Sequence, residues 1–433
     1  MKHLNKIILF ALCCGFFISI TGCEEEVGLM KIDRNSSQSY HVDALSGNDI
    51  NDGTIDQPWQ SLDKVTETLF IPGDTIFFKR GTSYNGSVTI NGDGTDTQRI
   101  TIGAYGVGIA PRFTNPDYNV NSGNAMQIRG DYHIVENLYF HHTAPATSNA
   151  SSFEEIWGVG ALHVSLGNDH VIVRNNEFAN VPKAIQSYSQ YSLITENYIH
   201  DANMDQENGF LQDPYWGPIG IQLGIGNQEV SYNRIENMYA VGGAFVADGG
   251  AIEIDDGRNH KDNIHIHHNK TLHNMGFMEV SYWDDIAFMQ SNNVKVEYNL
   301  SRDYQSFLLW WAPTNNSLVK NNTILRDDNE ITGNWNAVII MDVPPGHLEF
   351  TKNIVVVDND QTESVFIQGF DGAVDDVIHT DNCYWNANGG SIDLGLPLGY
   401  GEIFTDPLFV NYIDKNYHLQ STSTVIGWGA FGD

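Results

Sequence analysis

Cysteine is scarce in this sequence: four residues among 433, at positions 13, 14, 23 and 383. Three of them lie within the first 23 residues, so the body of the chain contains Cys383 alone. A disulfide framework and a metal site built from cysteines are therefore excluded. Stability must come from a large packed core, and a chain of this length is long enough to form one.

Basic residues are also few. The chain carries 22 Lys and Arg against 54 Asp and Glu, for a formal net charge of −32 at pH 7. This balance argues against nucleic acid as a partner, because phosphate binding requires clustered Lys and Arg. An anionic substrate would need basic residues concentrated at its binding site, against the sign of the whole surface.

The N-terminus has the pattern of a secretory signal peptide over residues 1–22. Lys2 and Lys6 precede an apolar run over residues 7–20, which is too short for a comfortable membrane span. Ile20-Thr21-Gly22-Cys23 resembles the lipobox of bacterial lipoproteins, which implies that Cys23 is the lipidated first residue of the mature protein.

Residues 23–39 form an acidic and polar stretch that is typical of a tether. We therefore expect an outer-membrane lipoprotein that faces the periplasm or the cell surface, with the folded domain over residues 40–433.

Long helical patterns are missing as well. The one helix signal is residues 58–65, where Trp59, Leu62 and Val65 recur at a spacing of three. The rest of the chain is rich in Gly, Asn, Tyr and β-branched residues, and its short apolar-polar alternations predict strands.

A unit of apolar and polar residues that ends in Asn recurs along the chain. The repeated Asn positions are spaced by 21 to 39 residues and are Asn137, Asn176, Asn197, Asn233, Asn269, Asn299, Asn322, Asn353 and Asn382. This period predicts a solenoid of parallel strands in which stacked Asn side chains hydrogen-bond at each turn. The irregular spacing favours a β-helix with loops of varying length over a propeller or a leucine-rich horseshoe.

Segments at both ends resemble right-handed parallel β-helix proteins of the pectate-lyase-like superfamily. Tyr40-His41-Val42-Asp43, Pro58-Trp59 and Pro72-Gly73-Asp74-Thr75 are similar to their N-terminal segment and first coil, and Asp406-Pro407-Leu408-Phe409 with His418-Leu419-Gln420 to their last. The resemblance implies an all-β, right-handed parallel β-helix with a short N-terminal capping helix, from a superfamily with carbohydrate-active members. The fold hosts many functions, so activity must be argued from the site.

A second strand follows each Asn unit, and these strands align without gaps by their apolar second position. Their third positions are Gln186, Gln222, Glu253, Glu279 and Leu309, and their fifth positions are Tyr188, Gly224, Asp255, Ser281, Trp311 and Asp342. Alternation along a strand places both positions on the outer face of the coil.

This alignment brings three carboxylates together. Glu253 and Glu279 on successive coils would lie about 5 Å apart, and Glu253 and Asp255 on one strand about 7 Å apart. Such crowding raises the pKa of one carboxyl toward that of a general acid. A spacing of about 6.5–9.5 Å suits an inverting glycosidase, and about 5–5.5 Å a retaining one.

The predicted substrate-binding residues surround these acids. The amides and hydroxyl of Gln186, Gln222 and Tyr188 would bond sugar hydroxyls, and Trp311 and Trp283 would stack on a sugar ring. His260 would line the cleft. The long insertion over residues 203–220 would wall it and supply Trp216 as a subsite residue.

Metal binding is an alternative use of the acidic residues. Asp255, Asp256, Asp284 and Asp285 offer carboxylate oxygens to calcium, the one cofactor that the pattern admits. His265 and His267 share one outer face at the spacing of zinc ligands, but the favoured interpretation is that they are solvated or line the cleft.

A polysaccharide lyase on the same fold is the rival interpretation. It would abstract a proton beside a uronate carboxylate, and the candidate bases are Lys183, Arg258, His260, Lys270 and Tyr282. The aligned columns carry acids and amides where a lyase needs cations. Glu-x-Asp on one strand resembles the acid and base pair of β-helical iota-carrageenases, and fucan-cleaving hydrolases also occur on β-helices.

We therefore expect a monomeric, surface-anchored glycoside hydrolase acting on an acidic polysaccharide such as carrageenan or fucan. Glu253 or Glu279 would be the general acid and Asp255 the base. A non-catalytic glycan-binding lipoprotein is the third alternative, because it would use the Trp faces without coupled carboxylates.

Overall fold

The computed structural model describes residues 29–31, 36–116, 124–143, 160–202, 217–241, 246–255, 259–281, 290–328, 338–341, 346–357, 365–368 and 376–433. The predicted signal peptide and lipidated Cys23 lie outside these residues. Within them, no helix is both long and apolar enough to cross a membrane.

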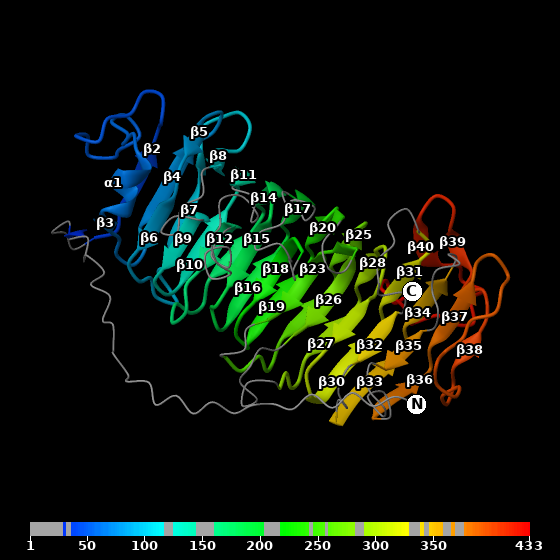
Figure 1. Ribbon diagram of the computed structural model, residues 1–433. Helices are drawn as coiled ribbons and strands as arrows, with labels where there is room; N and C mark the ends of the chain where they lie inside the picture. Colours follow the sequence, from blue (N-terminus) through cyan, green and yellow to red (C-terminus); the bar gives the residue numbers. More distant parts are fainter. Residues whose placement is uncertain are drawn as a thin grey trace, which may run out of the picture.

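Three parallel sheets run the length of the molecule (Figure 1). Sheet A consists of β1 (Met30–Lys31), β3 (Thr68–Leu69), β6 (Val88–Asn91), β9 (Asn124–Arg129), β12 (Gly160–Val164), β15 (Lys183–Ser187), β18 (Ile219–Leu223), β23 (Gly250–Ile254), β26 (Gly276–Val280), β29 (Leu308–Trp310), β32 (Ile339–Met341) and β35 (Phe366–Gln368). Sheet B consists of β2 (Ser39–Val42), β4 (Thr75–Lys79), β7 (Ile100–Tyr105), β10 (His133–Glu136), β13 (Ile172–Arg174), β16 (Ser192–Thr195), β19 (Gln228–Ser231), β24 (His265–His267), β27 (Lys295–Glu297), β30 (Thr314–Lys320), β33 (Gly346–Thr351) and β36 (Val377–Thr380). Sheet C consists of β5 (Ser83–Asn85), β8 (Arg112–Asn115), β11 (Tyr139–Thr143), β14 (Glu177–Val181), β17 (Tyr198–Ala202), β20 (Arg234–Glu236), β25 (Lys270–Leu272), β28 (Leu300–Arg302), β31 (Thr323–Arg326), β34 (Ile354–Val357), β37 (Cys383–Asn386) and β38 (Ile403–Phe404).

From β3 to β37, apart from the hairpin of β21 (Ala240–Val241) and β22 (Ala247–Asp248), successive strands enter sheets A, B and C in turn. Each of these coils therefore contributes one strand to each sheet and pairs with the neighbouring coils. Parallel strands joined by such crossovers are right-handed. The chain is a right-handed parallel β-helix. The prediction from the Asn repeat is confirmed, although the first strand, β1, lies inside the range that we expected to be a tether.

The interior of the coil is a continuous apolar core. Ile185, Ile221, Ile252, Met278 and Leu308 occupy equivalent register positions on successive strands of sheet A, and each is at most 2% exposed. Each such side chain contributes about 1.5–3 kcal/mol by its burial. This stack fixes which residues of sheet A face outward, because a shift by one residue would expose the whole set.

A ladder of asparagines joins the coils at the turn between sheets B and C. From Asn176 to Asn382, each side-chain Nδ2 donates to the Oδ1 of the next Asn at 2.9–3.2 Å, and Asn382 donates to Glu402. The predicted ladder is confirmed over these eight residues. The residue before each Asn adopts a positive φ, as Glu196 (56°) and Tyr232 (56°) do.

Asn137 does not belong to this ladder, contrary to the prediction. The strand register pairs Val135 with Val173, which places Asn137 beside Asn175 at the left-handed position. Buried Leu138 takes the place of an Asn in that coil, and its backbone N–H donates to Asn176 Oδ1 at 3.0 Å.

Both ends of the solenoid are covered. Helix α1 (Leu62–Thr66) lies at the N-terminal end (Figure 1) and begins later than predicted, because the Ser61 side chain caps it by accepting from the Lys64 backbone N–H. At the C-terminal end, β39 (Phe409–Asn411) and β40 (Asn416–Leu419) form an antiparallel hairpin rather than the expected last coil. Its apolar side chains pack with those of β31, β34 and β37.

Candidate active site

The outer face of sheet A carries the acidic cluster in the predicted register. Gln186 pairs with Gln222, Gln222 with Glu253, Glu253 with Glu279, and Glu279 with Leu309. Neighbouring parallel strands lie about 4.8 Å apart, so the two glutamates are separated by one strand spacing. We call this row of third positions the third column; it extends back through β12 at His163 and β9 at Gln127.

Asp255 lies two residues after Glu253, in a second row of outward-facing residues that runs parallel to the third column. Its backbone N–H donates to Leu223 O, and the equivalent bonds of Gly224, Ser281 and Trp311 continue the same row, which we call the fifth column. The side chain of Asp255 is 3% exposed. Asp255 directly follows the end of β23 and is two residues from Glu253, which corresponds to about 7 Å along extended backbone.

Burial and mutual repulsion set the protonation of the glutamates. Burial raises the pKa of Glu253 well above its ordinary value, and the charges of Asp255 and Glu279 raise it further. Burial, followed by the charges of Asp248 and Asp255, raises the pKa of Glu279 to about 8. Glu279 therefore holds a proton at neutral pH, and the pKa of Glu253 is shifted in the same direction, as that of a general acid must be.

Trp311, a residue of the fifth column, forms a hydrogen bond with Glu279. The indole Nε1 of Trp311 donates to Glu279 Oε1 at 2.9 Å, which opposes the rise in the pKa of Glu279. The half-buried Trp311 was predicted to stack on a sugar ring; its indole N–H also holds one oxygen of Glu279 in place.

Lys183 supplies a positive charge to the cluster. Its side chain is 1% exposed, and burial lowers its pKa to about 8 although the charges of Glu253 and Asp255 raise it. From the sequence it was predicted only as a base for the rival lyase. In the folded chain its ammonium group interacts electrostatically with Glu253 and Asp255.

The two predicted amides form part of a hydrogen-bonded row. His163 Nδ1 lies 2.6 Å from Gln186 Oε1, and Gln186 Nε2 donates to Gln222 Oε1 at 2.8 Å. Gln186 and Gln222 are 2% and 0% exposed. Gln222 lies between Gln186 and Glu253 in the third column.

Tyr188 fills the space over Gly224 in the fifth column. A Cβ on Gly224 would come within 2.2 Å of the Tyr188 ring, so only glycine leaves room for the ring beside Asp255. Tyr188 is 5% exposed. The ring therefore lies over Gly224, the residue next to Asp255 in the fifth column.

Two members of the cluster were missed from the sequence. Asp248 ends β22 (Ala247–Asp248), which pairs antiparallel with β21 (Ala240–Val241) outside the coil repeat, and burial raises its pKa to about 6. Leu162 occupies the apolar second position and His163 the third position of one more strand of the alignment. Extending the alignment by one coil would therefore have found His163.

Other predicted residues lie elsewhere or outside the described ranges. His260 is exposed in the turn beside Gly226. Lys270 is exposed on sheet C, and His265 and His267 lie on sheet B. Outside the described residues are Trp216, Asp256, Arg258, Tyr282, Trp283, Asp284, Asp285 and Asp342.

No metal cluster is found among the described residues, where no three His, Cys, Asp or Glu side chains are arranged to hold an ion. The proposed calcium ligands Asp256, Asp284 and Asp285 are not among these residues, so the calcium site stays a prediction.

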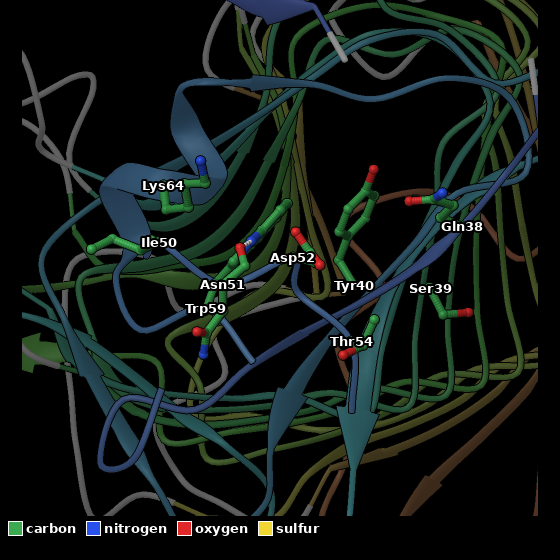
Figure 2. Close-up of a pocket in the computed structure, with 9 residues that line it drawn as sticks. All are labelled: Gln38, Ser39, Tyr40, Ile50, Asn51, Asp52, Thr54, Trp59 and Lys64. Atoms are coloured by element: carbon green, nitrogen blue, oxygen red, sulfur yellow. Dashed lines mark hydrogen bonds between the residues drawn. The ribbon is translucent and has the colours of Figure 1, made fainter. Parts of the chain in front are cut away.

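A separate pocket of about 710 Å³ lies at the N-terminal end of the solenoid (Figure 2). Tyr40 and Trp59 stack in it at 4.5 Å between ring centroids, and Trp59 Nε1 donates to Asn51 O. The residues that line this pocket include a single acidic side chain, that of Asp52, so the pocket does not offer the paired carboxylates found on sheet A. The acidic cluster is the stronger candidate site.

Comparison with solved structures places the fold among carbohydrate-active enzymes. The lacto-N-biosidase of glycoside hydrolase family 136 from Eubacterium ramulus has a TM-score of 0.53 and 14% identity over 84% of this chain and 67% of its own. Pectate lyase Pel9A has a TM-score of 0.51 and 15% identity over 93% of each chain. XylC, solved with xylose, has a TM-score of 0.50 and 12% identity over 86% of this chain and 87% of its own.

The chain shares the right-handed parallel β-helix with these proteins. At such low identities the likeness extends to the fold alone, and the neighbours include both hydrolases and lyases. No protein-family model matches the sequence, and neither does any curated protein.

Proposed function

We propose that the protein is a glycoside hydrolase that cleaves a polysaccharide at the outer face of sheet A. The observation that carries this proposal is the in-register pair of Glu253 and Glu279, with Asp255 two residues along the same strand. Most glycosidases use a pair of carboxyl groups, about 5–5.5 Å apart in retaining enzymes and about 6.5–9.5 Å apart in inverting ones.

Glu253 is the general acid. Its pKa is raised by burial and by Asp255 and Glu279, so it enters the reaction protonated. The proton of Glu253 passes to the glycosidic oxygen as the bond to the anomeric carbon breaks. Asp255 takes a proton from the water that attacks this carbon from the opposite face, and the configuration inverts. If Glu279 instead attacks in its ionised form, which is the minor form below its pKa of about 8, a glycosyl-enzyme forms that water then hydrolyses, and the configuration is retained.

The test is a panel of algal and plant polysaccharides, including carrageenan and fucan, assayed for new reducing ends. Proton NMR of the first product then gives the anomeric configuration. Glu253→Gln and Asp255→Asn are expected to lower kcat by at least about 100-fold. Glu229→Gln, which changes an exposed carboxylate on sheet B, is the matched control and is expected to keep full activity. Full activity of Glu253→Gln would refute the proposal.

An acidic polysaccharide is the proposed substrate. Lys183 is the cation of the cluster, and its ammonium group would offset an anionic group on the sugar next to the cleaved bond. Lys183→Met should then weaken the binding of an anionic substrate more than that of a neutral one.

A lyase is the second candidate, because Lys183 has the lowered pKa of a general base. Its neutral amine would take the proton beside a uronate carboxylate, and the glycosidic oxygen would leave with its electron pair to give an unsaturated uronate. Ultraviolet absorbance by the products would decide for the lyase, and reducing ends without absorbance for the hydrolase.

The third alternative, that the protein binds a glycan without cleaving it, is tested with the Glu253→Gln variant and the wild type. A Glu253→Gln protein that binds the polysaccharide but does not turn it over supports an enzyme. A wild-type protein that binds without any turnover supports the binder.

We also propose that the protein is a monomer anchored in the outer membrane through a lipid on Cys23. Radiolabelled palmitate should enter the wild-type chain and be absent from Cys23→Ala, which should leave the membrane fraction. Light scattering of the soluble variant should give the mass of one chain.

A further inference from the structure

A directed row of hydrogen bonds leads along the third column to the proposed general acid. It begins at His163 Nδ1, passes through the amide of Gln186 at 2.6 Å, and reaches the amide of Gln222 at 2.8 Å. Glu253 is the next residue of the column. Gln127, one coil before His163, stands outside the row, because its Nε2 donates to Ser165 Oγ.

The histidine determines the direction of this row. An amide oxygen only accepts hydrogen bonds, so His163 Nδ1 must carry the proton that it donates to Gln186 Oε1. Burial lowers the pKa of His163 to about 4, so the ring is neutral at physiological pH and its other nitrogen carries no proton. Each amide then presents its oxygen toward His163 and its N–H group toward the carboxylates.

The row ends in an incomplete pair. Gln222 Nε2 and Glu253 Oε2 are both buried, and neither has a hydrogen-bond partner in the part of the chain that the structure describes. Gln222 is 0% exposed. A buried donor and a buried acceptor without partners are costly, and their neighbouring positions in one column suit a group that accepts from one and donates to the other. A sugar hydroxyl is such a group.

We propose that a substrate hydroxyl bridges Gln222 Nε2 and Glu253 Oε2, and that His163 is the positioning residue that points the Gln222 N–H group at this hydroxyl. The proposal rests on the hydrolase function, and it adds the requirement for a free hydroxyl next to the cleaved bond. The hydroxyl accepts from Gln222 and donates to the Glu253 oxygen that does not carry the catalytic proton. A sugar substituted at that hydroxyl does not fit.

The direction of the row is tested without any substrate. In protein labelled with nitrogen-15 histidine, the NMR signals of His163 should show a neutral ring with the proton on Nδ1 at pH 7, identified by their loss in His163→Asn. A proton on Nε2 would reverse the row and overturn the proposal. This test does not depend on activity, so it fails or succeeds separately from the hydrolase assignment.

The bridge is tested kinetically on the substrate found with the panel. Gln222→Leu should lower kcat/KM by about 10- to 100-fold, chiefly through KM, because it removes one buried hydrogen bond. Gln127→Leu is the matched control in the same column and should stay within about twofold of wild type. If Gln222→Leu kept the wild-type KM and kcat, no substrate hydroxyl would bind between Gln222 Nε2 and Glu253 Oε2, and the proposed bridge would be refuted.

His163 is tested by a pair of variants. His163→Phe removes the donor, so the amides can reverse and place Gln222 Oε1 beside Glu253. That oxygen favours the protonated carboxyl, so the alkaline limb of the kcat/KM profile should move to higher pH. His163→Asn keeps a donor near the Nδ1 position and should restore the wild-type limb. Equal activity loss in both variants with an unmoved limb would reduce His163 to a structural residue.

Discussion

Replacing Glu279 with glutamine is expected to make the protein more stable and less active. The unfolded chain ionises this group above its ordinary value of 4.5, whereas the folded protein holds the proton up to about 8. Between these two values the folded state binds more protons, so its stability falls as the pH rises. At pH 7.5 the cost has an upper bound of about 4 kcal/mol, from about three pH units over which the folded state keeps its extra proton. The neighbouring carboxyls titrate together with Glu279. We therefore expect the Glu279→Gln variant to gain only about 2 kcal/mol in its free energy of unfolding at pH 7.5.

Urea denaturation at pH 5 and pH 7.5, followed by tryptophan fluorescence, measures this gain. The side chain introduced by Glu279→Gln keeps an oxygen for the Trp311 indole, so the substitution removes the charge and little else. The variant should exceed wild type by less than about 0.5 kcal/mol at pH 5 and by about 2 kcal/mol at pH 7.5. The control Glu196→Gln alters an exposed carboxylate and should leave both values unchanged. A gain that is absent, negative or equal at the two pH values would refute the reasoning.

Three further predictions concern the ladder and the walls of the site. Asn269→Ala removes several buried hydrogen bonds of the Asn ladder and should lower the free energy of unfolding by about 3 kcal/mol, and a loss below about 1 kcal/mol in urea denaturation would contradict the role given to the ladder. Gly224→Ala places a Cβ within 2.2 Å of the Tyr188 ring, so kcat/KM should fall at least about tenfold with an unchanged circular dichroism spectrum. Activity equal to wild type would show that the ring position does not matter. Trp311→Phe removes the N–H that lowers the pKa of Glu279, so a carbon-13 titration of this carboxyl should move to higher pH; a shift to lower pH would argue against the bond.

The register of sheet A could be predicted because its signal is local. An apolar residue at the second position of every aligned strand must face the core, and this condition alone pairs Glu253 with Glu279. The Asn ladder was harder to place. Asn137 and the doublet Asn175-Asn176 offer two alignments, and the residues alone do not say whether an Asn accepts a ladder bond or takes the left-handed turn beside it.

The rest of the site depends on contacts that the repeat does not encode. Asp248 comes from a hairpin that leaves the coil, so no period places it near Glu279. Lys183 shares its register position with an isoleucine and a glycine on the next two coils, so nothing in the alignment marks it as a partner of the carboxylates. The direction of the amides depends on His163, two coils before Gln222, and only the bond at its Nδ1 reveals that direction.

The regular stacking of coils has a consequence for how such a site can change. Distances between groups on sheet A come in fixed steps: about 4.8 Å from one coil to the next, and about 7 Å between alternate residues of a strand. A whole coil inserted between β18 and β23 would move Gln222 away from Glu253 by one such step, while the Asn ladder would simply gain a rung. The separation of two catalytic groups on this scaffold can therefore take only a few values. A change between inversion and retention requires a carboxylate at a different residue position of sheet A, and bending the backbone would not achieve it.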